Sequence, residues 1–294
     1  MDKGDKEEFG RQGGVWKKIR LLIYRALPTF ARSLMNENQP SILALDFDGV
    51  LCDGLIEYFE TAWRTYCQIW SLTSQSPPAD LAANFYNLRP VIETGWEMPV
   101  LIAALIQGVS TEQILHQWSA IAQSILHQSN LQAPDIATKL DKIRDEWIST
   151  DVDSWLSLHR FYPGVVEKMR SLLNSPIQPL IVTTKEGRFV SQLLQQQGIN
   201  MPSEWIIGKE SKRPKHQILR ELIAAQAETS KALWFVEDRL KTLQLVQQQS
   251  DLSAVKLYLA DWGYNTASER EAARLDPNIE LLSLRQFSQE FATN

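Results

Sequence analysis

The stretch ILALDFDGVLCDG, residues 42–54, decides the fold of this 294-residue chain. It begins as a run of aliphatic residues typical of a buried strand, and it ends in Asp46, one aromatic residue, Asp48 and a glycine. Carboxylates at the tip of an apolar strand are costly to desolvate unless a partner compensates their charge. A divalent cation, together with a reaction that employs two acids, would supply that compensation.

Four further aliphatic runs resemble the one at residues 41–47. They predict buried strands at 179–184, 204–208, 232–236 and 255–260. The runs do not alternate between apolar and polar residues, which is typical of a parallel sheet with both faces covered. The segments between them carry apolar residues at three- and four-residue spacing, and this spacing predicts helices. Together they indicate an α/β fold, an open parallel sheet in three layers.

Residues 55–158 interrupt this alternation, because their apolar residues recur with a helical period and no strand is evident. We therefore expect an all-helical cap inserted directly after the first strand. The predicted organisation is a basic N-terminal extension over residues 1–38, a helical cap over 55–158, and an α/β core formed by 39–54 and 159–294.

Composition limits the possible partners. A net charge of −5 and a pI near 5.5 argue against nucleic acid. Two cysteines, Cys52 and Cys67, make no disulfide framework and favour a reducing compartment. No run reaches the roughly 18 apolar residues of a membrane-spanning helix. We expect a cytoplasmic protein, a monomer or small homo-oligomer. The basic amphipathic segment 14–34 suggests contact with a membrane surface, but a loosely held extension is the favoured interpretation.

Polar residues follow several of the predicted strands. Since ligands of an open parallel sheet bind beyond the carboxyl ends of its strands, these residues are expected to meet at one edge. The set comprises Asp46 and Asp48 after the first strand, Thr183, Thr184 and Lys185 after the second, Lys212 and Lys215 before the helix that follows the third, and Glu237 and Asp238 after the fourth. Acids, hydroxyls and ammonium groups at one edge indicate a reaction centre.

In this order the residues resemble the four motifs of the haloacid dehalogenase (HAD) superfamily, in its phosphatase-like branch with a helical cap. D-F-D-G-V-L at 46–51 matches the first motif, DxDG[VT]L, and IVTTK matches the second. A lysine ahead of a helix matches the third, and the pair Glu237-Asp238 matches the fourth. The resemblance extends over about residues 40–270, including DWGYNT at 261–266. It implies a Rossmann-like core and hydrolysis of phosphate monoesters.

The resemblance also implies roles for individual residues. Asp46 would be the nucleophile that forms an aspartyl-phosphate, and Asp48 would be the general acid and base. Thr183 and Lys215 would bind the phosphoryl group. Mg²⁺ would be held by Asp46, the main-chain carbonyl of Asp48, and Asp238, since this ion prefers oxygen ligands.

Two positions depart from the family pattern or leave it open. Glu237 stands where the fourth motif often has glycine, and Thr242 stands where a later aspartate is common. We therefore expect Glu237 to act as a second acid, near the metal or its waters. For the third-motif lysine, Lys215 is favoured over Lys212.

Residues 87–99 combine arginine, glutamates, glycine and tryptophan, a mixture unusual inside a plain helix. We expect this segment to face the active site. Arg89 and Glu97, together with Thr184, would then bind the organic part of the substrate. The alternative is an arginine–glutamate surface pair beside a tryptophan that fills the cap core.

The favoured function is a Mg²⁺-dependent phosphatase that acts on a small phosphorylated metabolite of the glycolate, sugar or nucleotide type. Two alternatives remain open. A phosphomutase would share the whole core, and a non-catalytic binding protein could retain the fold. The intact residues Asp46, Asp48, Thr183 and Asp238 favour an enzyme.

Overall fold

The structure is a computed structural model that describes residues 39–71, 76–225, 232–289 and 291–292. The predicted N-terminal extension, residues 1–38, lies outside the described residues. None of the helices in the described ranges combines the length and apolar character needed to cross a membrane.

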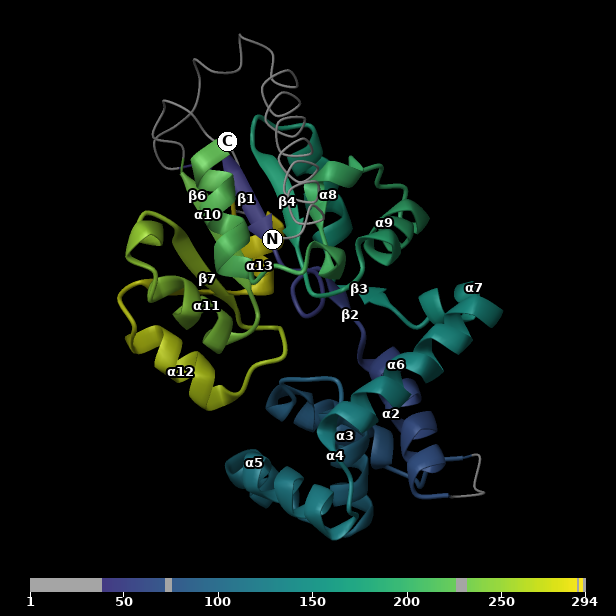
Figure 1. The fold of residues 1–294 in the computed structure, drawn as a ribbon. Helices are drawn as coiled ribbons and strands as arrows, with labels where there is room; N and C mark the ends of the chain where they lie inside the picture. Colours follow the sequence, from purple (N-terminus) through teal and green to yellow (C-terminus); the bar gives the residue numbers. More distant parts are fainter. Residues whose placement is uncertain (1–38, 72–75, 226–231, 290, 293–294) are drawn as a thin grey trace, which may run out of the picture.

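A six-stranded sheet with the order β5-β4-β1-β6-β7-β8 forms the centre of the molecule (Figure 1). Every neighbouring pair in this sheet is parallel. The strands are β1 (Ile42–Leu45), β4 (Gln178–Val182), β5 (Ile206–Ile207), β6 (Leu233–Glu237), β7 (Lys256–Ala260) and β8 (Ile279–Leu282). The predicted α/β class is confirmed, and the edge strand β8 is an addition to the five predicted strands.

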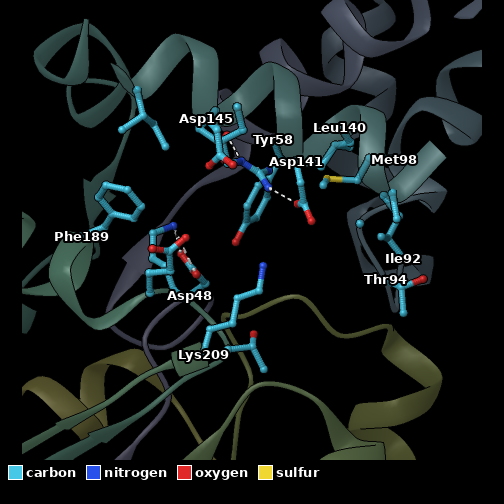
Figure 2. Close-up of a pocket in the computed structure, with 18 of the residues that line it drawn as sticks. Asp48, Tyr58, Ile92, Thr94, Met98, Leu140, Asp141, Asp145, Phe189 and Lys209 are labelled. Atoms are coloured by element: carbon cyan, nitrogen blue, oxygen red, sulfur yellow. Dashed lines mark hydrogen bonds and ion pairs between the residues drawn. The ribbon is translucent and has the colours of Figure 1, made fainter. Parts of the chain in front are cut away.

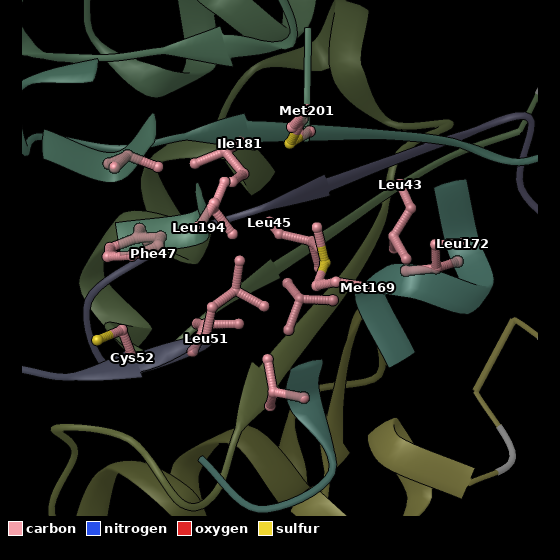
Figure 3. Close-up of a cluster of buried hydrophobic side chains, with 14 of the residues drawn as sticks. Leu43, Leu45, Phe47, Leu51, Cys52, Met169, Leu172, Ile181, Leu194 and Met201 are labelled. Carbon is pink, nitrogen blue, oxygen red and sulfur yellow. The ribbon is translucent and has the colours of Figure 1, made fainter. Parts of the chain in front are cut away.

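Helices cover both faces of the sheet. The α-helices of this part are α8 (Val165–Leu173), α9 (Gly187–Gln196), α10 (Lys215–Ala225), α11 (Leu240–Gln247), α12 (Ala267–Leu275) and α13 (Leu284–Gln289). Short 3₁₀ helices are η3 (Ser203–Trp205), η4 (Lys209–Ser211) and η5 (Ser250–Leu252). Successive side chains of a strand point to opposite faces. Accordingly, Leu43 and Leu45 pack with Met169 of α8 (Figure 3), whereas Ile42 and Ala44 belong to the cluster on the other face.

Residues 55–158 are here called the helical insertion, and every regular element in their described part is a helix. These are α2 (Leu55–Ile69), α3 (Leu81–Leu88), η2 (Arg89–Val91), α4 (Glu97–Ile106), α5 (Thr111–Gln128), α6 (Ala133–Thr150) and α7 (Val152–Leu156). They bury a hydrophobic cluster of their own that includes Phe59, Phe85 and Leu101. Figure 1 shows them grouped beyond one end of the sheet.

A two-stranded antiparallel ladder joins the insertion to the sheet. It pairs β2 (Cys52–Asp53), where the chain leaves the first strand, with β3 (Arg160–Phe161), where it returns. Because the two crossings lie side by side, the insertion is fixed at the carboxyl end of β1. Neither short strand was predicted. The division of the chain into cap and core at residues 54 and 159 stays a prediction.

Candidate active site

The loop after β1 presents the two aspartates in different directions. Asp46 continues the strand, since its N–H donates to the carbonyl of Val236 at 2.9 Å. The Phe47 N–H then donates to Asp46 Oδ1 at 2.8 Å and fixes the carboxylate. Gly49 follows with a φ of +86°, a backbone conformation in the left-handed region that favours glycine. The two carboxylates have different partners, since Asp46 contacts Lys215 and Asp48 contacts Lys185.

Three buried carboxylates, including that of Asp46, meet at the end of β1. One oxygen each from Asp46, Glu237 and Asp238 lies within 4.8 Å of the others. The Lys215 ammonium, at the first residue of α10, lies 2.9 Å from Asp46 Oδ2 and 2.6 Å from Glu237 Oε2. Asp238 Oδ2 accepts a hydrogen bond from the Tyr264 N–H at 2.7 Å. These three acids are called the acid cluster below.

The acid cluster contains three carboxyl groups, and among the described residues only one ammonium group, that of Lys215, pairs with them. Burial, reinforced by the nearby Glu237, raises the pKa of Asp46 to about 7 although Lys215 opposes the shift. Burial also raises the pKa of Glu237 and of Asp238. Burial alone would lower the pKa of Lys215, but the carboxylates of Asp46 and Glu237 raise it. One ammonium cannot balance three acids, so this set of oxygen donors fits a divalent cation such as Mg²⁺.

Asp48 is not part of the acid cluster and pairs with Lys185. The Lys185 ammonium lies 3.2 Å from Oδ1 and 3.4 Å from Oδ2 of Asp48. It also lies 5.3 Å from the ring centre of Trp155 and 5.9 Å from that of Tyr58, both in the helical insertion. Any contribution of Asp48 to a metal would therefore come through its main-chain carbonyl. The sequence places Lys185 at a strand end but indicates no role for it.

Thr183 and the two candidate lysines can also be placed. Thr183 is buried at the end of β4, where its Oγ1 accepts a hydrogen bond from the Lys185 N–H at 3.1 Å. Lys215 lies in the acid cluster, whereas Lys212 is exposed on the turn before α10. Of the two lysines, Lys215 is the one beside Asp46, and the choice of Lys215 as the third-motif lysine stays a prediction.

A cavity of about 400 Å³ lies between the sheet and the helical insertion (Figure 2). It reaches Asp48 but is not lined by Asp46. From the sheet side it is lined by Asp48, Thr184 and Lys185, and from the insertion by Arg89, Asp141 and Arg144, among others. The predicted substrate-binding residues Arg89 and Thr184 thus both border the same space.

Arg89 is held by aromatic rings. Its guanidinium carbon lies 4.6 Å from the ring centre of Tyr264 and 5.0 Å from that of Tyr58. Its Nη1 donates to the carbonyl of Ile92 at 3.0 Å. The buried Nε has no hydrogen-bond partner among the described residues. Arg89 therefore borders the cavity, while its Nε is buried from solvent.

Glu97 does not belong to the cavity lining, and this prediction is wrong. Its Oε2 accepts hydrogen bonds from the N–H groups of Glu93 and Thr94 at 2.7 and 2.6 Å. Its Oε1 accepts from the indole Nε1 of Trp118 at 2.9 Å. The carboxylate is fully used to hold the turn before α4. Its neighbours Glu93, Thr94 and Gly95 line the cavity instead.

Sequence reasoning also missed a buried ion pair beside the cavity. Arg144 Nε on α6 lies 2.8 Å from Glu57 Oε1 on α2, and Glu57 is only 1% exposed. Burial would raise the pKa of Glu57, but the Arg144 guanidinium outweighs it and lowers that pKa to about 2. The two residues are 87 positions apart, so no local pattern could have joined them.

Fold and site together define an α/β protein with a helical insertion over the carboxyl ends of its parallel strands. The sequence profile of haloacid dehalogenase-like hydrolases matches residues 102–248, half of the chain, and the chain belongs to this family.

Individual relatives are more distant. The chain is 25% identical to the phosphoglycolate phosphatase of Pseudomonas putida KT2440 over 180 residues, which is 59% of this chain and 64% of that enzyme. The match therefore spans less than two thirds of the relative. A crystal structure titled a predicted phosphatase, from Clostridium acetobutylicum, superposes with a TM-score of 0.54 at 13% identity, over 86% of this chain and 98% of its own. Another crystal structure, titled a predicted phosphoglycolate phosphatase, from Haemophilus somnus, superposes with a TM-score of 0.52 at 17% identity. This match covers 78% of this chain and 89% of the other. At such identities these structures support the fold alone.

Proposed function

We propose that the protein is a Mg²⁺-dependent phosphatase that hydrolyses the phosphate monoester of a small metabolite through an aspartyl-phosphate. The observation that carries the proposal is the acid cluster at the end of β1, with the Lys215 ammonium 2.9 Å from Asp46. The family of the chain and the name of the Pseudomonas putida relative support it.

The reaction would proceed in two steps on the side chains of this chain. A carboxylate oxygen of Asp46 attacks phosphorus, the ester P–O bond breaks, and the leaving alkoxide takes a proton from Asp48. Water then attacks phosphorus and gives a proton to Asp48, the P–O bond to Asp46 breaks, and inorganic phosphate leaves with the Asp46 carboxylate restored. Lys215 and Thr183 would bind phosphoryl oxygens throughout, which stabilises charge that develops in the transition state.

Asp46, Glu237, Asp238 and the main-chain carbonyl of Asp48 would hold Mg²⁺, which would neutralise phosphate charge. Arg89 and Thr184, on the cavity wall, would bind the organic part of the substrate. The proposed substrate is a small soluble metabolite, and we accordingly place the protein in the cytoplasm.

The test measures hydrolysis of p-nitrophenyl phosphate by the full chain with Mg²⁺. Asp46→Asn is expected to reduce kcat by about 10³-fold or more, because loss of a nucleophile removes the covalent route. Chelation should abolish activity, and added Mg²⁺ should restore it.

Asp153→Asn is the matched control for that test. It makes the same chemical change in the chain's second D-x-D sequence, at an exposed position on α7, and should leave the rate unchanged. Equal rates in the wild type and Asp46→Asn, with circular dichroism showing both folded, would exclude the proposed function.

A further inference from the structure

The cavity is large for the smallest candidate substrates. At about 30 Å³ per water molecule, its 400 Å³ correspond to about a dozen waters. A two-carbon acid on the leaving side of the ester would fill only a small part of this space. Because the cavity borders Asp48 but not Asp46, its volume lies on the side of the proton donor, where the leaving group departs.

Most charges around the cavity are already paired. Asp48 is bound by Lys185, and Glu57 is bound by Arg144. Glu93 is bound by Lys241, which lies outside the cavity lining, at 2.6 Å. The charges that remain available to a ligand come from a few other positions of the lining.

Two acids of the lining, Asp141 and Asp145, lie one helical turn apart on α6, and both are exposed. Figure 2 shows both carboxylates directed into the cavity, with the Lys209 ammonium reaching in from the sheet side. Among the described residues, no ion pair is made by Asp145 or Lys209, and Asp141 lies 3.9 Å from Arg144. Arg89 also lines the cavity and makes no ion pair among the described residues.

Hydrogen-bond acceptors on one wall of the cavity and donors on the opposite wall match the hydroxyl groups of a ligand. A carboxylate only accepts hydrogen bonds and an ammonium only donates, whereas a hydroxyl does both. A chain of hydroxyls could donate to Asp141 and Asp145 and accept from Lys209. Met98 and Leu140 add apolar surface for the carbon skeleton. A leaving group with its own carboxylate would instead meet two acids of the same charge.

We infer that the leaving group is a sugar-sized polyol, so that the substrate class is the monosaccharide phosphates rather than the phosphorylated two-carbon acids. This inference rests on the proposed phosphatase function and deepens it. Its specificity would come from Asp141, Asp145 and Lys209, which lie on the cavity wall away from the acid cluster.

A substrate series tests the inference with the full chain and Mg²⁺. Phosphoglycolate, glycerol 3-phosphate, ribose 5-phosphate and glucose 6-phosphate are compared by kcat/KM, with both free phosphate and sugar isomers measured. We expect the best sugar phosphate to exceed phosphoglycolate by at least about tenfold, the equivalent of one or two added hydrogen bonds. Equal or better turnover of phosphoglycolate would overturn the inference.

Variants connect the preference to the cavity wall. Asp141→Asn with Asp145→Asn should lower kcat/KM for the best sugar phosphate by about tenfold more than it lowers that for p-nitrophenyl phosphate. Glu146→Gln, on the same helix but outside the cavity lining and paired with Lys142, is the control and should change neither. An equal loss on both substrates would overturn the assignment of these acids.

The possible failures can be told apart. Absence of hydrolysis with every ester, including p-nitrophenyl phosphate, would reject the proposed function and the inference with it. Formation of a sugar isomer in place of free phosphate would reject the phosphatase in favour of a mutase. Hydrolysis of p-nitrophenyl phosphate with a preference for phosphoglycolate would reject the inference alone.

Discussion

At Gly49 the lack of a side chain allows two loops of the site to touch. A Cβ at this position would lie 2.1 Å from Oδ2 of Asp238 and 3.0 Å from the ring of Tyr264. Gly263 approaches from the other side, where a Cβ would lie 2.3 Å from the Cβ of Asp238. Asp238 is therefore enclosed by two glycines, and its position in the acid cluster depends on both.

Gly49→Ala should displace Asp238 and weaken the proposed cation site. The left-handed backbone would cost the alanine about 1–2 kcal/mol, and its methyl group would also collide with the carboxylate. We expect the Mg²⁺ concentration for half-maximal hydrolysis to rise by about tenfold or more, which corresponds to about 1.4 kcal/mol of lost binding. A Mg²⁺ titration of p-nitrophenyl phosphate hydrolysis measures this.

Gly108→Ala is the matched control for that substitution. Gly108 has a φ of +79°, but a Cβ added there would meet no atom of the described residues within 4 Å. The variant therefore carries the backbone strain without the collision. It should lose stability in urea denaturation and keep its Mg²⁺ dependence. The same Mg²⁺ dependence in both variants would contradict the role of Gly49.

Some site residues could be inferred from sequence because they lie next to strand ends. Asp46 directly follows one apolar run and Asp238 lies one residue beyond another, so the sheet alone predicts that they meet. Glu97 could not be placed correctly, because its partner Trp118 lies 21 residues away on another helix. Lys185 received no role, because its partner Asp48 is 137 residues distant. Contacts between distant elements depend on packing that no local pattern encodes.

Between elements, the contact of α2 with α6 depends on a buried charge. Glu57 Oε1 accepts hydrogen bonds from Thr61 Oγ1 at 2.7 Å and from Arg144 Nε at 2.8 Å. Removing one partner of a buried ion pair leaves the other charge uncompensated, which typically costs about 3–5 kcal/mol. Arg144 therefore fixes one wall of the cavity as well as the helix contact.

Arg144→Met should destabilise the protein by about 3 kcal/mol at pH 7, and the loss should shrink in acid. In the folded protein the pKa of Glu57 is lowered from 4.5 to about 2. A carboxyl with a lowered folded pKa stabilises the fold above its unfolded pKa, and this contribution is lost as the pH falls from about 4.5 to about 2. Urea denaturation of the wild type and of Arg144→Met at pH 7, 5, 4 and 3 measures how the difference in their free energies of unfolding changes with pH.

Lys142→Met provides the comparison on the same helix. Its ammonium lies 3.8 Å from Glu146 in an exposed pair, which is worth at most about 1 kcal/mol. A loss for Arg144→Met that stays constant from pH 7 to pH 3 would contradict the assigned role of Glu57.

Strand prediction succeeded where the burial was strongest. The central strands β1, β4 and β6 are buried along their whole length, and each contains a run of at least three apolar residues that is visible in the sequence. The edge strand β8 has a mixed burial pattern, with Glu280 exposed between apolar neighbours, so it resembles a loop. The ladder of β2 and β3 is two residues long on each side, too short for any periodicity.

In the described part of the molecule, three hydrophobic clusters divide the interior. Two cover the faces of the sheet, and the third fills the helical insertion. Phe85 is fully buried in the third cluster. Its ring packs edge-on against that of Phe59, with the two ring centres 5.6 Å apart. Because that cluster is separate, the insertion has its own source of stability.

Phe85→Ala should loosen the helical insertion without unfolding the sheet. Removing a buried phenylalanine typically costs about 3–5 kcal/mol. Hydrogen exchange followed by mass spectrometry should show faster exchange in peptides from residues 55–158 and little change in β1, β4 and β6. Phe235→Ala, in a sheet cluster, is the counterpart and should speed exchange in the strands. Faster exchange throughout the chain in Phe85→Ala would contradict this division.

Arg239 directly follows Asp238 and joins the two parts of the molecule. Its Nη1 donates to the carbonyl of Pro90 in the insertion at 2.8 Å and to that of Tyr264 at 2.7 Å. If Asp238 holds a cation as proposed, the loop that binds the ion also binds the helical insertion. Ion affinity and the docking of the insertion on the sheet would then be thermodynamically linked, and each would strengthen the other by the same factor.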